Sequence, residues 1–223
     1  MHYALLLVMG KILNEEFFNR PTLTVAKELL GKYLVRKVGS KTIALMITET
    51  EAYDGFKDLA SHAHRGQTPR NTPMFDKPGT IYVYFTYGIH WMLNLVCGKK
   101  EYPAAVLIRG VQAPQEHSFE KVLGSPISRR PLRGGLAGQT FSQDFPAPLL
   151  LNGPAKLTKF LQIDKSLNHQ MLSKKAGLWV EDRGVVIKPR DISRTPRIGI
   201  NYAGDYVHKP WRFVIKNKNT PPR

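Results

Sequence analysis

The stretch Met46-Ile-Thr-Glu-Thr-Glu-Ala-Tyr-Asp-Gly-Phe-Lys-Asp-Leu-Ala-Ser-His-Ala-His64 decides how the fold is interpreted. It starts as a β-strand, with apolar and β-branched residues up to Ile47. Glu49, Glu51 and Tyr53 follow at alternate positions, so they share one face, with the two carboxylates roughly 7 Å apart. If that face is buried, one carboxyl should have a raised pKa, which suits a general acid or base. The alternative is an edge strand whose acidic side lies in water.

The net charge points to a polyanionic partner. The chain has 33 Lys and Arg against 17 Asp and Glu, a formal charge of +16. A basic surface of this size favours nucleic acid. Acidic residues are scarce, so three of them between Glu49 and Phe56 stand out. The combination suggests a catalyst that acts on nucleic acid.

Length and cysteine content indicate the general class of protein. With 223 residues, 42% of them hydrophobic, the chain is predicted to form one domain over residues 1–223. Cys97 is the only cysteine, so no intrachain disulfide can form and a reducing, cytoplasmic setting is expected. The apolar run 3–9 lacks a cationic flank and is too short to span a bilayer. We therefore expect it to pack on the domain, with no membrane association.

The hydrophobic pattern predicts an α+β fold, a mixed domain with an antiparallel β-sheet, surrounding helices and a protruding β-hairpin. Helices are expected at residues 14–31 and 152–162, with a short helical turn at 58–64. Strands are expected at residues 33–38, 41–53, 81–86, 89–96, 104–109, 179–188, 197–200 and 211–216.

The predicted hairpin at residues 79–96 carries Tyr87 and Gly88 at its tip. A large aromatic residue at such a tip is costly in water, so one alternative is a tip folded back onto the core. In a cationic protein the tyrosine can instead wedge between base steps of a duplex. Both alternatives are open at this point.

Residues 112–150 are predicted to form a long loop. Between Gln112 and Leu149 there are five prolines, four glycines and a basic cluster that includes Arg129, Arg130 and Arg133. A loop of this length is either functional or a mobile insertion.

Other chemistries find little support in the sequence. His62 and His64 with Glu51 could ligate a metal, but the single cysteine and the lack of further clustered ligands argue against a metal site. No glycine-rich phosphate loop is present, so no nucleotide cofactor is expected. Lys156 at a helix start suits phosphate or solvent better than a Schiff base.

An aromatic pocket is the remaining candidate. Tyr53, His62 and Tyr84 would each be ordinary core residues if considered alone. Together with Glu51 they could line a pocket whose aromatic faces hold a flat base.

A set of motifs in order carries a family resemblance. They are Glu-Thr-Glu-Ala-Tyr (49–53), Ala-Ser-His (60–62), Gln-Thr-Pro-Arg-Asn (67–71), Met-Phe with Lys-Pro-Gly-Thr (74–80), Tyr-Val-Tyr-Phe-Thr-Tyr-Gly (82–88), Gly-Pro-Ala-Lys-Leu (153–157), and Arg-Ile-Gly-Ile, Ala-Gly-Asp and Lys-Pro-Trp-Arg-Phe (197–213). The chain resembles the alkyladenine (3-methyladenine) DNA glycosylase family from about Leu13 to Ile215. Residues 112–149 depart from the family pattern, because the helix usual there is hard to see.

The resemblance implies a catalytic set. Glu51 would be the general base that activates water, and Arg109 with the backbone carbonyl of Ile198 would hold that water. The resemblance also implies a single mixed α/β domain with an antiparallel sheet and a protruding hairpin, which agrees with the pattern of the residues.

The resemblance also implies a base-binding set. Tyr53, His62 and Tyr84 would form the stacking pocket for a flipped purine, and His62 would also read its edge. Asn94 would lie at the pocket wall and screen substituted purines. Tyr87 would fill the space that the flipped base leaves in the duplex.

The implied activity is base excision repair without a metal or cofactor. A monomer would bind double-stranded DNA that contains damaged purines and flip the damaged base out of the duplex. The expected bases are 3-methyladenine and 7-methylguanine, with hypoxanthine and ethenoadenine as further candidates. Hydrolysis of the N-glycosidic bond would then leave an abasic site. It would act in the cytoplasm, at the nucleoid of a bacterium or in the nucleus of a eukaryote. A non-catalytic nucleic-acid binding module and a tRNA-modifying enzyme remain as alternatives, and release of free purine from methylated duplex DNA distinguishes the three.

The charge leads to a first prediction. Affinity for undamaged duplex DNA should fall steeply between about 50 and 200 mM salt, because cationic side chains that bind phosphates release condensed counterions. Fluorescence anisotropy of a labelled duplex measures this. An affinity that does not change over this range would show that the charge of +16 is not used to bind DNA.

Overall fold

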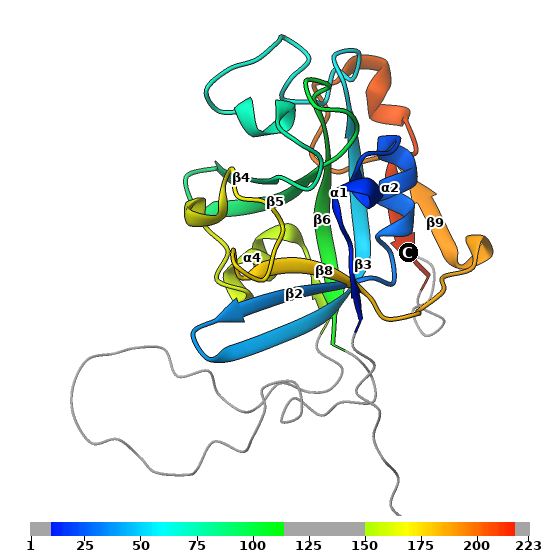
Figure 1. The fold of residues 1–223 in the computed structure, drawn as a ribbon. Helices are drawn as coiled ribbons and strands as arrows, with labels where there is room; N and C mark the ends of the chain where they lie inside the picture. Colours follow the sequence, from blue (N-terminus) through cyan, green and yellow to red (C-terminus); the bar gives the residue numbers. More distant parts are fainter. Residues whose placement is uncertain (1–9, 114–149, 217–223) are drawn as a thin grey trace, which may run out of the picture.

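The computed structural model describes residues 10–113 and 150–216. Within these residues ten strands form one sheet in which every pairing is antiparallel, and the central order is β1-β8-β2-β3-β6-β5-β4 (Figure 1). The strands are β1 (Lys11–Ile12), β2 (Tyr33–Val38), β3 (Lys41–Asp54), β4 (Ile81–Thr86), β5 (His90–Val96), β6 (Ala104–Gln112), β7 (Leu150–Asn152), β8 (Leu178–Asp182), β9 (Ile192–Thr195) and β10 (Arg212–Ile215). The helices are α1 (Glu15–Phe18), α2 (Thr22–Glu28) and α4 (Pro154–Phe160), and the 3-10 turns are η1 (Thr72–Phe75), η2 (Lys165–Leu167), η3 (Pro189–Asp191) and η4 (Gly204–His208). The predicted α+β class is confirmed.

Strand β3 organises the sheet. It has 14 residues, of which residues 46–54 run beside β6, and the two long strands stand side by side at the centre of the molecule (Figure 1). On its other side β3 pairs first with β2, over residues 41–46, and then with β10, over residues 49–51. The C-terminal half of β3 is therefore covered on both edges, which excludes the predicted alternative of an exposed acidic edge strand.

A bulge directs the carboxylates of β3. The register between β3 and β6 shifts on both sides of Glu49, opposite Gly110. A Cβ atom at Gly110 would lie only 3.0 Å from the Cβ of Glu49, so a glycine permits this close approach. Beyond the bulge the hydroxyl of Thr50 donates to the carbonyl of Ala26 in α2. Since neighbouring residues of a strand point to opposite faces, Glu51 points away from α2.

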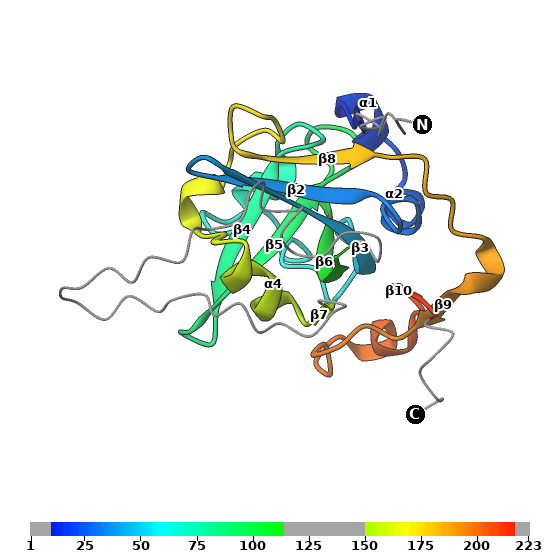
Figure 2. The ribbon, with the colours of Figure 1, turned by 90° about the horizontal axis from the view of Figure 1, so that it is seen from below.

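Helices cover the two faces of β6. Helix α2 packs on β3 and β6, whereas α4 packs on β5 and β6. The two helices lie on opposite sides of these strands when the molecule is seen from below (Figure 2). Val25 and Ala26 of α2 and Leu157 of α4 are fully buried and belong to the main hydrophobic cluster. Both helices thus pack apolar side chains against the sheet.

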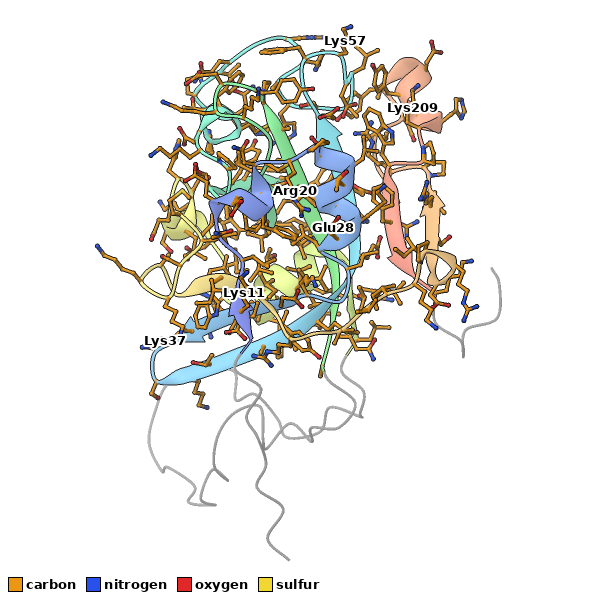
Figure 3. The ribbon with its side chains drawn as sticks, turned by 45° about the vertical axis from the view of Figure 1, so that its right-hand side comes forward. Lys11, Arg20, Glu28, Lys37, Lys57 and Lys209 are labelled. Carbon is orange, nitrogen blue, oxygen red and sulfur yellow. The ribbon has the colours of Figure 1, made fainter. Side chains whose placement is uncertain are left out.

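Basic side chains lie at widely separated points on the surface. Lys37 marks the end of the β2–β3 hairpin, while Lys57 and Lys209 both lie at the end of the molecule where β3 finishes (Figure 3). Arg20 and Glu28 form an ion pair of 2.8 Å beside α2. Among the residues that the structure describes, no helix is long and apolar enough to cross a membrane.

Several predicted elements have different boundaries in the structure. The helix expected at residues 14–31 is two helices, because Pro21 disfavours helical backbone at the residue before it and α1 ends at Phe18. The helix expected at 152–162 is α4, whose N-cap is Gly153 and not Asn152. The strand expected at 179–188 ends at Asp182.

Two predicted elements are wrong. Residues 58–64 form separate turns and no helix: the N–H of Ser61 donates to the carbonyl of Asp58 and that of His64 to the carbonyl of Ser61, while the carboxylate of Asp58 accepts the N–H of Ala60. Residues 197–200 belong to no strand, and the preceding strand, β9, was not predicted. The predicted loop at 112–150 falls mainly on residues outside the described ranges, although its two ends, Gln112 and Leu150, pair with each other.

Candidate active site

Glu51 lies at the centre of the candidate site. Its side chain is completely buried. The backbone N–H of Ile198 donates to its Oε1 atom at 2.8 Å, and the hydroxyl of Tyr53 donates to Oε2 at 2.9 Å. The guanidinium of Arg109 lies 3.5 Å from Oε2. Three segments of the chain thus converge on one carboxylate.

The pKa of Glu51 is raised above its ordinary value, and burial is the main cause. Arg109, the Ile198 N–H and the Tyr53 hydroxyl each act in the opposite direction, because they stabilise the ionised form. The charge of Glu49 raises the pKa too, but it is the smallest of these causes. The raised pKa predicted for one carboxyl of the pair is therefore found, and it comes mainly from desolvation.

Glu49 has a different setting from Glu51. Its Oε1 atom accepts a hydrogen bond from the Nε of Arg109 at 3.0 Å and from the Nε of Arg212 at 2.6 Å. Arg212 itself lies opposite Glu51 on β10. Glu49 therefore contacts two guanidinium groups and fixes the orientation of Arg109, the one that also reaches Glu51.

A cavity of about 370 Å³ opens beside this carboxylate. Tyr53, Arg109 and Ile198, the three residues that contact Glu51, all line it. The other lining residues are Ala60, His62, Met74, Tyr82, Tyr84, Thr86, Tyr87, Met92, Asn94, Ala105, Leu107, Pro154, Gly199, Ile200 and Tyr202. The volume and the mixture of aromatic and polar groups are typical of a small-molecule site.

An aromatic wall forms one side of the cavity. The rings of His62 and Tyr84 meet edge to face with centroids 4.6 Å apart, and the centroids of Tyr82 and Tyr84 are 5.4 Å apart. The Nδ1 of His62 lies 2.9 Å from the hydroxyl of Tyr82. Burial is also the main cause that raises the pKa of Tyr84 to about 12, so its hydroxyl stays neutral.

Tyr82 is a site residue that the sequence analysis missed. It is almost fully buried, it lines the cavity and it contacts His62. The sequence could have indicated Tyr82, because residues 82 and 84 of one strand share a face and Tyr84 was already a candidate.

Asn94 lies at the wall of the cavity. It is buried on β5 opposite Tyr82, and its amide donates to the Tyr82 carbonyl at 3.3 Å. This contact fixes the orientation of the amide beside the cavity.

Tyr87 lies at the exposed tip of the β4–β5 hairpin. It is 82% exposed, and its backbone has a φ of 52°, a left-handed conformation that is uncommon for residues other than glycine. Since the side chain is largely in solvent, the alternative of a tip folded onto the core is wrong. Tyr87 borders the mouth of the same cavity.

Two other candidates do not join the site. Among the described residues no cluster of three His, Cys, Asp or Glu side chains is arranged to hold a metal ion. The Nδ1 of His64 contacts the Ser61 carbonyl instead. Lys156 is exposed near the start of α4 and is not a lining residue of the cavity.

Comparison with known proteins shows the family of the chain. The family model described as methylpurine-DNA glycosylase (MPG) matches residues 16–219. The chain belongs to the methylpurine-DNA glycosylase family. It is therefore a DNA glycosylase, an enzyme that hydrolyses N-glycosyl bonds in DNA and acts in DNA repair, and neither a simple binding module nor a tRNA-modifying enzyme.

The curated relatives cover almost the whole chain. A protein of Methanocella arvoryzae is 42% identical over 206 residues, which is 92% of this chain and 93% of the relative. A protein of Clostridium botulinum is 38% identical over 207 residues, with 92% and 96% covered. Each of these relatives is named "Putative 3-methyladenine DNA glycosylase".

The setting of His62 leads to a second prediction. Its pKa is lowered to about 4, mainly by burial and further by Arg70 and His64, so the imidazole is neutral at physiological pH. A histidine NMR titration, assigned by loss of the signal in His62→Gln, should give a midpoint near 4. In the unfolded chain the imidazole of His62 takes up a proton near pH 6.5, whereas in the folded protein it stays neutral down to about pH 4. The folded protein should therefore lose stability as the pH falls from about 6.5 to about 4. A midpoint near 6.5 would contradict this prediction.

Proposed function

We propose that this glycosylase excises alkylated purines, 3-methyladenine and 7-methylguanine among them, from duplex DNA. The purine is flipped into the cavity, Glu51 activates a water that attacks the sugar carbon, and an abasic site remains. The observation that carries the proposal is a fully buried carboxylate beside an aromatic cavity in a chain of charge +16. The names of the relatives support the choice of 3-methyladenine.

The carboxylate fits the chemistry of the bond that breaks. Positive charge develops on the sugar as the base leaves, much as in glycoside hydrolysis, and a nearby carboxylate stabilises it while it accepts a proton from water. The raised pKa of Glu51 brings its basicity closer to that of an effective general base at neutral pH. Arg109 and the Ile198 carbonyl are proposed to hold the attacking water.

The aromatic wall fits the leaving base. A purine alkylated at N3 or N7 is cationic, and cations are attracted to the electron-rich faces of Tyr53 and Tyr84. His62 is neutral, so it does not repel such a base. Its Nδ1 is occupied by Tyr82, which leaves Nε2 for the edge of the base. Asn94 limits the room for substituents at the wall.

Removal of the carboxylate is the first test. Glu51→Gln keeps the shape of the side chain but cannot accept the proton, so single-turnover excision of 7-methylguanine should fall at least about 10²-fold while lesion binding persists. Release of free base, measured by chromatography, gives the rate.

Glu49→Gln is the matched control, because it changes the other carboxyl of the same strand and keeps an oxygen for Arg109. Its effect should be much smaller. Excision by Glu51→Gln at nearly the parent rate would exclude Glu51 as the base.

Replacement of the hairpin aromatic is the second test. A flipped base leaves a gap that costs a few kcal/mol of stacking, and an inserted ring recovers part of it. Tyr87→Ser should therefore reduce the flipped population, reported by the fluorescence of 2-aminopurine beside the lesion, and reduce excision from duplex DNA. Binding to undamaged duplex should change little.

Ile89→Ser is the control for this variant. Ile89 is 68% exposed on the same hairpin tip and is not among the residues that line the cavity. A Tyr87→Ser protein that flips the base as fully as the parent would show that Tyr87 does not act as the wedge.

A further inference from the structure

Next to the catalytic carboxylate lies a buried ion pair with no role in the proposed reaction. The side chains of Arg197 and Asp58 are both inaccessible to solvent. Arg197 donates two parallel hydrogen bonds, from Nη1 to Oδ2 at 2.6 Å and from Nη2 to Oδ1 at 2.8 Å. This bidentate geometry fixes the guanidinium in one orientation.

The pair connects three separate segments. Nη1 of Arg197 also donates to the carbonyl of Ala52 in β3, one residue from Glu51. Asp58 accepts the backbone N–H groups of Asp54, at the end of β3, and Ala60, in the loop that leads to His62. Residues 196–200 are thus tied to β3 and to the loop after it, although they belong to no strand.

The guanidinium also contacts two aromatic rings. Its Cζ atom lies 4.8 Å from the ring centroid of Tyr53 and 5.0 Å from that of Trp211. Tyr53 lines the cavity whereas Arg197 does not, so the cation supports the tyrosine from outside the cavity. This contact restrains the ring whose hydroxyl donates to Glu51.

The next residue after Arg197 completes the connection. The N–H of Ile198 donates to Oε1 of Glu51 at 2.8 Å, yet the Ile198 side chain is 50% exposed and contributes little packing. Arg197 is therefore a buried anchor directly before this N–H, and Ile200, which packs with Ala60 and Ala203, is a buried anchor after it. A displacement of about 1 Å at a reacting group can cost about 10²-fold in rate.

We propose that Arg197 and Asp58 are positioning residues of this glycosylase: their ion pair holds the Ile198 N–H and the Tyr53 hydroxyl on Glu51. The inference rests on the proposed role of Glu51. Stability alone does not explain the pair, because a buried ion pair can often be replaced by neutral side chains without loss of stability. Arg197 and Asp58 do not touch the substrate in this account.

The test uses the double variant Asp58→Asn/Arg197→Met. Removal of one partner would leave an unpaired buried charge and strongly destabilise the protein. The double variant leaves no unpaired buried charge, and thermal unfolding checks that it is folded. Single-turnover excision of 7-methylguanine from a duplex should fall about 10- to 100-fold, with binding of the same duplex little changed.

A second readout does not depend on activity. A ¹³C NMR titration of the Glu51 carboxyl, assigned with Glu51→Gln, should show its midpoint at higher pH in the double variant, because donors that stabilise the carboxylate are displaced. A merely structural pair would leave this midpoint unchanged.

The double variant Glu181→Gln/Arg183→Met is the control, because it too removes both members of a pair. Arg183 donates two hydrogen bonds to Glu181 and lies 4.5 Å from the ring centroid of Tyr33, an ion pair beside an aromatic ring that does not involve the cavity. This control variant should change neither the excision rate nor the Glu51 midpoint.

The outcomes separate the two proposals. A folded double variant that excises at the parent rate would overturn the positioning role. If neither the parent nor the control double variant releases base, the proposed function fails. The NMR midpoint alone then decides whether the ion pair positions Glu51: a shifted midpoint supports this role, and an unchanged midpoint overturns it.

Discussion

The burial of one carboxylate, Glu51, is the constraint around which the described structure is built. Removing a charge from water is costly unless hydrogen bonds compensate for it. Here the compensation comes from the Ile198 N–H, the Tyr53 hydroxyl and Arg109. These donors do not fully offset the effect of burial, so the pKa of Glu51 stays raised and the group is more basic than a solvated carboxylate.

The elements around Glu51 follow from the need to supply these donors. The bulge of β3 at Glu49 allows both carboxylates to meet Arg109 of β6. Strand β10 covers the free edge of β3 beside Glu51. The ion pair of Asp58 with Arg197 fixes the irregular segment that carries Ile198. In a strand paired on both sides, ladder hydrogen bonds would occupy this N–H and it could not reach a side chain.

The sequence predicted the parts of this arrangement that depend on local patterns. Alternation and β-branched content placed β2, β3, β4 and the hairpin correctly, and the spacing of Glu49, Glu51 and Tyr53 predicted a shared face. The contacts that depend on distant segments could not be seen. Residues 197–200 look like a strand because Ile198 and Ile200 are β-branched and two positions apart, yet the buried ion pair of Arg197 with Asp58, far away in the sequence, decides their conformation.

The pH dependence of single-turnover excision of 7-methylguanine tests the central claim most directly. If the ionised form of Glu51 is the base, the rate of the parent enzyme falls as the pH drops through the carboxyl pKa, with a midpoint above the usual value of about 4.3 for glutamate. The residual activity of Glu51→Gln lacks this acidic limb. A parent rate that stays constant across this range while the protein remains folded, or the same limb in Glu51→Gln, would contradict the account.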